Sequence, residues 1–241
     1  MSTTIKTQKI ILAGSFGLLL SLGTQAASIN YVLDQTNIET VMPDGHPYVT
    51  VTIEDGITFG ADTNAVKFTV DAIDSAFTTG GVTKLSNFGI RDFGFNLAAG
   101  APTVMDSNIV GPAGWTGNIV PPNNQLDGFG RFVGDIKGIG TNRFDPLVFW
   151  ITGVVGDTIA SYAAPSTNGN GGSAAQGNAW FAAHIGDFAI SSSSINSGYF
   201  GGGNGATPPP IAPVPLPAAL WLFMSALTGG YFSARKKNAI Q

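Results

Sequence analysis

The sequence predicts an all-β fold for residues 28–200: an antiparallel β-sandwich or jelly roll, in which two sheets pack face to face. Turn-forming residues are abundant, with 33 Gly and 14 Pro among 241 residues, while charged residues make up only 11%. Several segments in the middle of the chain alternate apolar and polar side chains with a period of two, the pattern of half-buried strands. No segment there keeps the 3.6-residue period of an amphipathic helix.

The N-terminal residues 1–27 have the parts of a secretory signal peptide. Lys6 and Lys9 supply a positive start, and residues 10–22 form an apolar segment too short to span a bilayer in the ordinary way. Thr24 and Ala26 then place small side chains where a signal peptidase requires them, so cleavage after Ala26 or the next alanine is expected. An uncleaved membrane anchor is the alternative.

Three segments in the first half of the domain are predicted as strands. In residues 48–55 the apolar side chains share one face, and Asp55-Gly56 is expected to form the following turn. In residues 65–74 four apolar side chains are expected to face inward: Val66, Phe68, Val70 and Ala72. Residues 88–97 shift phase midway, which predicts a β-bulge beside Gly94.

The second half of the domain shows a less regular pattern. Residues 146–152 are apolar on both faces, which favours a central strand buried from both sides. Residues 179–190 are predicted as a strand broken at Gly186, and residues 129–136 as a further strand. Residues 163–176 have the composition of a long exposed loop.

The C-terminal residues are predicted to lie outside the folded domain. Residues 201–213 are rich in Gly and Pro and are expected to form a linker. Residues 218–234 are uncharged and reach the short limit for a transmembrane helix. The basic cluster Arg235, Lys236 and Lys237 follows, and the positive-inside rule keeps it in the cytoplasm with the domain on the other side. A plain tail anchor and a buried core helix are the alternatives.

A short proline motif precedes that hydrophobic stretch: Val214, Pro215, Leu216, Pro217 and Ala218. With the hydrophobic stretch and the basic cluster, residues 214–241 resemble the PEP-CTERM sorting signal, in particular its VPLPA variant. The resemblance implies processing by an exosortase, a membrane enzyme with a cysteine nucleophile that cuts near the proline motif. Such proteins occur in Gram-negative bacteria that make exopolysaccharide, often in biofilms. The common signal has Glu in place of Leu216, so the exosortase subtype stays open.

Charge and cysteine content exclude several classes of function. All 15 acidic residues lie between Asp34 and Asp187 with six basic residues among them, so the middle of the chain has a net charge of −9. Such a surface repels phosphate backbones, and no nucleic-acid partner is expected. The chain has no Cys, which excludes thiolate zinc sites, thiol nucleophiles and iron–sulfur clusters.

The chain carries none of the common local catalytic motifs, such as G-x-S-x-G or H-E-x-x-H. His46 is expected to be solvated in a turn, and His184 to lie on the exposed side of a strand. No cofactor is expected. A structural Ca²⁺ site is the alternative to ordinary turn chemistry for four acidic residues: Asp34, Asp44, Asp55 and Asp62.

Aromatic residues beside loops are the candidates for ligand binding. Trp115 lies in a Gly-rich segment with no other bulky side chain, where it could stack on a sugar; filling the loop is the alternative. Tyr162 and Tyr199 also lie beside loop sequence. We therefore expect a non-enzymatic protein at the cell surface or in the extracellular matrix, associated with exopolysaccharide. Its other expected partners are signal peptidase, exosortase and, transiently, the inner membrane. A carbohydrate-binding module and a hydrolase with an active site assembled from distant residues are the alternatives.

Overall fold

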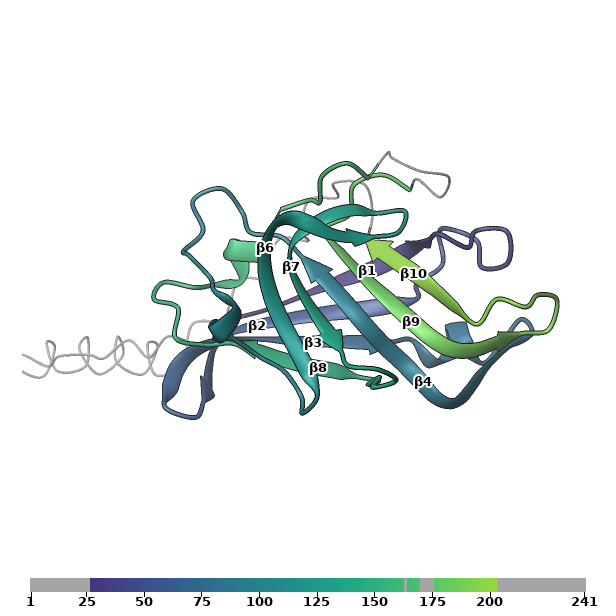
Figure 1. The fold of residues 1–241 in the computed structure, drawn as a ribbon, viewed down its shortest axis with the longest axis horizontal. Helices are drawn as coiled ribbons and strands as arrows, with labels where there is room; N and C mark the ends of the chain where they lie inside the picture. Colours follow the sequence, from purple (N-terminus) through teal and green to yellow (C-terminus); the bar gives the residue numbers. More distant parts are fainter. Residues whose placement is uncertain (1–26, 163, 170–175, 203–241) are drawn as a thin grey trace, which may run out of the picture.

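The computed structural model describes residues 27–162, 164–169 and 176–202, which form an all-β fold (Figure 1). Within these residues the strands are β1 (Ser28–Thr36), β2 (Val49–Phe59), β3 (Asp62–Ala72), β4 (Val82–Phe95), β5 (Ile109–Val110), β6 (Trp115–Leu126), β7 (Gly130–Gly138), β8 (Leu147–Ile151), β9 (Phe181–Ile190) and β10 (Ser197–Gly202). Three short 3₁₀ helices are interspersed: η1 (Asp74–Phe77), η2 (Asp106–Asn108) and η3 (Ile159–Tyr162).

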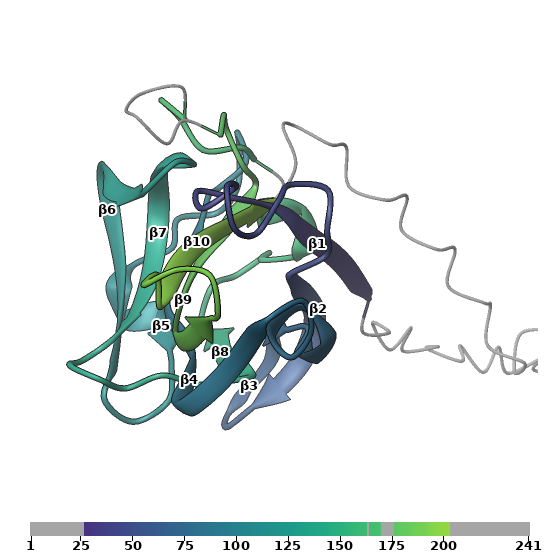
Figure 2. The ribbon, with the colours of Figure 1, turned by 90° about the vertical axis from the view of Figure 1, so that its right-hand side faces the viewer.

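The ten strands form one sheet in the order β5-β8-β3-β2-β1-β10-β9-β4-β7-β6, and all neighbouring pairs are antiparallel. The two halves of the sheet face each other as the layers of a sandwich do, and the strands surround the core in the end-on view of Figure 2. Hydrogen bonding nevertheless continues from one half to the other through β1 and β10, where two separate sheets were expected. The strand ladder therefore spans the whole described domain.

Aromatic rings fill the space between the two halves. Phe68 of β3 is fully buried and lies at the centre: its ring stacks on Phe149 of β8 at 4.7 Å between centroids and meets Tyr162 edge-on at 4.9 Å. The rings of Phe93 on β4 and Phe181 on β9 approach it from the other half at 6.3 and 6.5 Å. Burial of apolar area, at about 25 cal/mol per Å², is the main contribution to the free energy that holds the two halves together.

The expected faces of the early strands are confirmed. All four residues predicted to face inward on β3 are buried, and the three apolar residues of β2 at 49, 51 and 53 are fully buried. The prediction of a turn at Asp55-Gly56 is wrong, because β2 continues to Phe59. Its pairing with β3 is irregular between Glu54 and Ile57. Gly56 adopts a φ of 64°, which lets the strand absorb the irregularity without ending.

Two expectations for the later strands are also wrong. β8 lies next to the edge of the sheet, and only alternate residues are buried, while Val148 and Trp150 are half-buried. β9 is not broken at Gly186, because that residue pairs with both Ser197 and Gly89. An apolar run and a glycine are local features, whereas burial on both faces and strand pairing depend on the neighbouring strands.

The irregularity predicted in residues 88–97 occurs on β4, but earlier than Gly94. The pairing of β4 with β9 shifts register between Ile90 and Asp92, so Arg91 is the extra residue. The shift puts Asp92 opposite His184, which defines the surface described below. β1, β5, β6 and β10 have no counterpart among the predicted strands.

A second, smaller apolar cluster lies on the opposite face of the sheet from the aromatic core. It consists of Leu126, Phe129, Phe132, Ala179 and Ala182. Ala182 alternates along β9 with two residues of the main core and pairs with Gly94. A Cβ atom on Gly94 would overlap Leu126 and Phe132, so the hairpin of β6 and β7 packs here only over a glycine.

The described residues contain no helix with the length and apolarity needed to cross a bilayer. The predicted signal peptide, up to residue 26, the linker from residue 203 and the sorting tail 214–241 lie outside the described residues.

Candidate functional site

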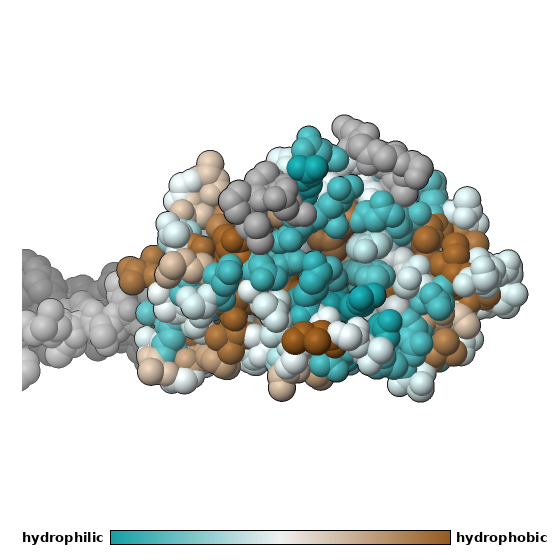
Figure 3. All heavy atoms as spheres, in the orientation of Figure 1, coloured by the Kyte–Doolittle hydropathy of each residue, from teal (hydrophilic) through white to brown (hydrophobic). Residues whose placement is uncertain are grey.

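One polar row crosses the face of the sheet opposite the aromatic core. It runs Tyr199, His184, Asp92, Lys137 and Thr116, one residue from each of β10, β9, β4, β7 and β6. Each residue is the register partner of the next, and the row is partly to fully exposed. Hydrophilic residues cover much of the surface over β4, β7 and β9 (Figure 3). We refer to these five residues as the polar row.

Lys137 binds two carboxylates at the middle of this surface. Its Nζ lies 2.8 Å from Asp135 Oδ2 and 3.3 Å from Asp92 Oδ2. Asn118 donates to Asp135 Oδ1 at 2.9 Å, so the buried Asp135 side chain is held on both oxygens. Burial would lower the pKa of Lys137, but the hydrogen bond to Asp135 and the charges of both carboxylates raise it above its usual value. The lysine therefore remains charged.

The carboxylate of Asp92 has fewer hydrogen-bond and charge partners than that of Asp135. Its side chain is only 13% exposed, and its Oδ1 atom is buried without a hydrogen-bond partner among the described residues. Burial raises the pKa of Asp92 to about 6, with the charge of Asp135 acting in the same direction and Lys137 opposing it. A carboxylate in this state can accept a hydrogen bond from a ligand hydroxyl that reaches the surface.

His184 and Tyr199 form an aromatic pair at the other end of the row. Their rings stack with centroids 4.3 Å apart and planes 10° apart. Burial, together with the positive charges of Arg91 and Arg143, lowers the pKa of His184 to about 4, so the imidazole is neutral at pH 7. Burial also raises the pKa of Tyr199, as do the nearby charges of Asp92 and Asp127. Both rings are uncharged and half-buried at physiological pH.

The loop before β8 places Arg143 beside His184. Phe144 exchanges two backbone hydrogen bonds with Ile90, at 2.9 and 3.1 Å, which fixes the segment against β4. The Arg143 side chain then lies over Gly186, where a Cβ atom would be 3.0 Å from its Nε. The surface thus combines an aromatic pair, buried carboxylates and cations, a combination suited to recognising a polar ligand.

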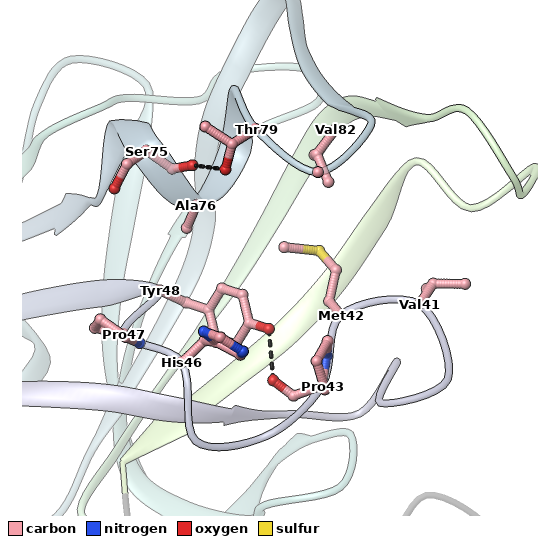
Figure 4. Close-up of a pocket in the computed structure, with 11 residues that line it drawn as sticks. Val41, Met42, Pro43, His46, Pro47, Tyr48, Ser75, Ala76, Thr79 and Val82 are labelled. Carbon is pink, nitrogen blue, oxygen red and sulfur yellow. Dashed lines mark hydrogen bonds between the residues drawn. The ribbon is translucent and has the colours of Figure 1, made fainter.

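A separate pocket lies between residues 41–48 and η1 and has a volume of about 400 Å³ (Figure 4). The Tyr48 hydroxyl donates to the Pro43 carbonyl at 2.6 Å, and the exposed His46 lies at the mouth. No Asp, Glu, Lys or Arg is among its described lining residues. The hydroxyls of Tyr48 and Thr79 donate within the protein, so the pocket offers a ligand less specific recognition than the polar row does.

Trp115 lies at the first position of β6 and not in a free loop. Its ring packs against the aromatic core side of the sheet, 6.0 Å from the ring of Phe144, and its indole N–H is buried without a partner among the described residues. Its register partner Gly138 directly follows Lys137 on β7, so Trp115 lies on the face opposite to the polar row. Of the other aromatic candidates, Tyr162 is fully buried and donates to Asp157 at 2.6 Å, whereas Tyr199 belongs to the polar row.

The acidic residues considered for Ca²⁺ mostly act as acceptors for backbone N–H groups. Asp44 accepts from Thr36, Asp55 from Ala27 and Ile159, and Asp62 from Asn64 and Gly153. Asp34 lies on β1. Within the described ranges no three His, Cys, Asp or Glu side chains are grouped closely enough to hold a metal ion. The sorting-motif residues 214–218 and the basic cluster lie outside the described residues.

No protein-family model, curated protein or solved structure matches this chain.

The sequence pattern alone did not reveal Asp92, Asp135, Lys137, Arg91 or Arg143 as a group. Four of them are ordinary polar residues on strands, and Arg143 lies in the loop before β8. The one available signal was the phase shift in residues 88–97, because a bulge commonly re-aims side chains at a functional surface.

Proposed function

We propose that this chain is an exported, non-enzymatic bacterial protein of the cell surface or extracellular matrix that binds exopolysaccharide through the polar row. In this proposal signal peptidase removes the N-terminal segment, the C-terminal segment holds the precursor in the inner membrane, and an exosortase acts at residues 214–218. The β domain is then the part that contacts the matrix.

The polar row is the observation that carries the binding proposal. A half-buried aromatic pair, His184 and Tyr199, adjoins groups that accept and donate hydrogen bonds, Asp92 and Lys137, on one open face. Carbohydrates present both apolar ring faces and hydroxyl groups, so they need aromatic and polar partners side by side. An open face can also accept a chain that continues beyond the contacted units.

A hydrolase is the alternative function, suggested by the position of His184 near the carboxylates of Asp92 and Asp135. Glycoside hydrolysis needs two carboxyl groups that both reach the substrate. Asp135 is 1% exposed and already bound by Lys137 and Asn118, so it is badly placed to act as nucleophile or base. The arrangement favours binding over hydrolysis.

Affinity electrophoresis of the full-length chain in non-ionic detergent, through gels containing exopolysaccharide from the producing bacterium, tests the proposal. We expect retardation of the wild-type chain and a loss of affinity of roughly fivefold to tenfold in Tyr199→Ala, since an aromatic contact contributes about 1 kcal/mol.

Trp150→Ala is the matched control. Trp150 is also half-buried and stacked, on Phe59 at 4.5 Å, but it lies on β8 in the other half of the sheet. It should leave retardation unchanged. A wild-type chain that migrates identically with and without polysaccharide would refute the binding function.

A further inference from the structure

We propose that Arg91 and Arg143 make the polar row selective for acidic polysaccharide, by receiving the carboxylate of a uronate unit that lies beside His184 and Tyr199. This inference rests on the proposed function and specifies the class of sugar.

Basic residues are unevenly distributed in this acidic domain. Of the six in its middle, three lie at or next to the polar row: Arg91, Lys137 and Arg143. The other two lysines are paired elsewhere, Lys67 with Glu54 and Lys84 with Asp74 and Asp145. Lys137 is itself occupied by two carboxylates.

Arg91 and Arg143 differ from these lysines. Within the described ranges neither guanidinium lies within ion-pair distance of a carboxylate, and Nε of Arg143 is buried without a hydrogen-bond acceptor. A buried donor without an acceptor costs free energy, so the protein leaves this guanidinium incompletely bonded. The other N–H groups of the half-buried Arg143 are proposed to donate to a ligand carboxylate. Guanidinium groups match carboxylates in geometry, and the resulting charge-assisted bonds are among the strongest hydrogen bonds in proteins.

The position of Arg143 is built by the fold. Two backbone hydrogen bonds between Phe144 and Ile90 fix the segment beside β4. The Arg143 side chain reaches β9, where Gly186 leaves room for the guanidinium. Arg91 is the extra residue at the bulge of β4, and it is exposed. Both positive charges act on His184. The two arginines therefore lie near His184, where a sugar ring is proposed to bind.

The negative charge of the whole domain does not prevent this recognition. Charges farther away than about 8 Å are largely screened at physiological ionic strength. Nearby, Asp92, Asp135 and Asp127 oppose an anionic ligand. Lys137 binds the first two, and Asp127 accepts a hydrogen bond from Asn37. The proposed site therefore recognises one carboxylate, at the arginine pair. The described surface offers no continuous row of basic residues that would bind a long polyanion.

His184 provides a direct readout of occupancy. Part of the reduction of its pKa comes from the two arginines, so a bound carboxylate that offsets their charge should raise this pKa. The full-length chain in detergent is titrated by NMR through its two histidines, alone and with oligogalacturonate, with neutral dextran oligomers, or with acetate at the same carboxylate concentration. We expect oligogalacturonate to raise the pKa of His184 and to leave the exposed His46 unchanged.

Binding is measured in parallel for the double variant Arg91→Gln/Arg143→Gln and for Lys67→Gln, which also removes positive charge but lies on β3. The double variant should lose affinity for oligogalacturonate roughly tenfold or more, while Lys67→Gln changes it less than twofold.

Three results would overturn the inference. Equal affinity for oligogalacturonate and dextran, with Tyr199→Ala weakening both, would remove the selectivity but leave the proposed function standing. Failure to bind either oligomer or the producer's own polysaccharide would remove both. An equal response of His184 to acetate would show an adventitious anion site only.

Discussion

Asp92 and His184 are register partners on β4 and β9, and burial shifts their pKa values in opposite directions. Asp92 has a folded pKa of about 6, above the ordinary value of 3.8, so the folded state takes up this proton before the unfolded chain does. Its contribution to stability therefore rises as the pH falls from about 6 to 4. The gain is on the order of 2–3 kcal/mol at most.

His184 has the opposite effect over nearly the same range. Its folded pKa of about 4 lies below the ordinary value of 6.5, so the unfolded chain binds this proton first as the pH falls. The stability associated with the neutral imidazole is present above pH 6.5 and is lost towards pH 4, again by an amount on the order of 2–3 kcal/mol. In the wild-type chain the two contributions largely cancel.

We predict that single substitutions expose these opposing contributions. Between pH 6.5 and 4.5, Asp92→Asn should lose more free energy of unfolding than the wild-type chain, because the gain from protonating Asp92 is absent. His184→Gln should lose less. Urea denaturation of the full-length chain across this range measures both differences, expected on the order of 1–2 kcal/mol. Stability curves of the two variants that run parallel to the wild-type curve would contradict the assigned pKa shifts.

The strands of the two halves are held together by aromatic rings, which makes Phe68 the critical contact between elements. Its ring meets rings from β4, β8, β9 and η3. We predict that Phe68→Ala lowers the free energy of unfolding by about 3–5 kcal/mol, through lost burial and the cavity that remains. Val148→Ala, on half-buried β8 surface, should cost about 1 kcal/mol or less. Equal losses in urea denaturation would contradict the central role of Phe68.

The packing of the β6–β7 hairpin over β4 depends on the absence of a side chain at Gly94. We predict that Gly94→Ala costs about 1–3 kcal/mol, because the new methyl group would overlap Leu126 and Phe132. Leu126→Ala vacates part of that space, so the double variant should lose less than the two single losses combined. A double-mutant cycle with a coupling energy near zero would exclude this contact as the cause.

At the scale of the whole molecule, the segregation of charge is the basis of the proposed export. The acidic residues lie between two uncharged stretches, each of which has basic residues on its outer side. Basic flanks remain in the cytoplasm and uncharged stretches enter the bilayer, so the acidic β domain would be translocated. The polar row would then face the extracellular matrix.

We predict that the surface-released protein lacks both ends. Intact-mass measurement should place its N-terminus at residue 27 or 28 and its C-terminus near Pro217. Pro215→Ala/Pro217→Ala should keep the protein in the membrane fraction at its longer mass, while a control substitution in the linker, Thr207→Ala, leaves release unchanged. Released protein that still carries Lys236 and Lys237 would contradict exosortase processing.

The sequence by itself determined the all-β class and the inward faces of β2 and β3, because alternation with a period of two is a local property of an extended chain. It also contained the pattern at the two ends from which export is proposed. Only the tertiary structure decided which strands pair and in which register. Asp92, Lys137, His184 and Tyr199 come from four strands, and nothing local in the chain brings them into line. The continuous ladder through β1 and β10 and the one-residue bulge at Arg91 do so, because register depends on long-range packing of the whole sheet.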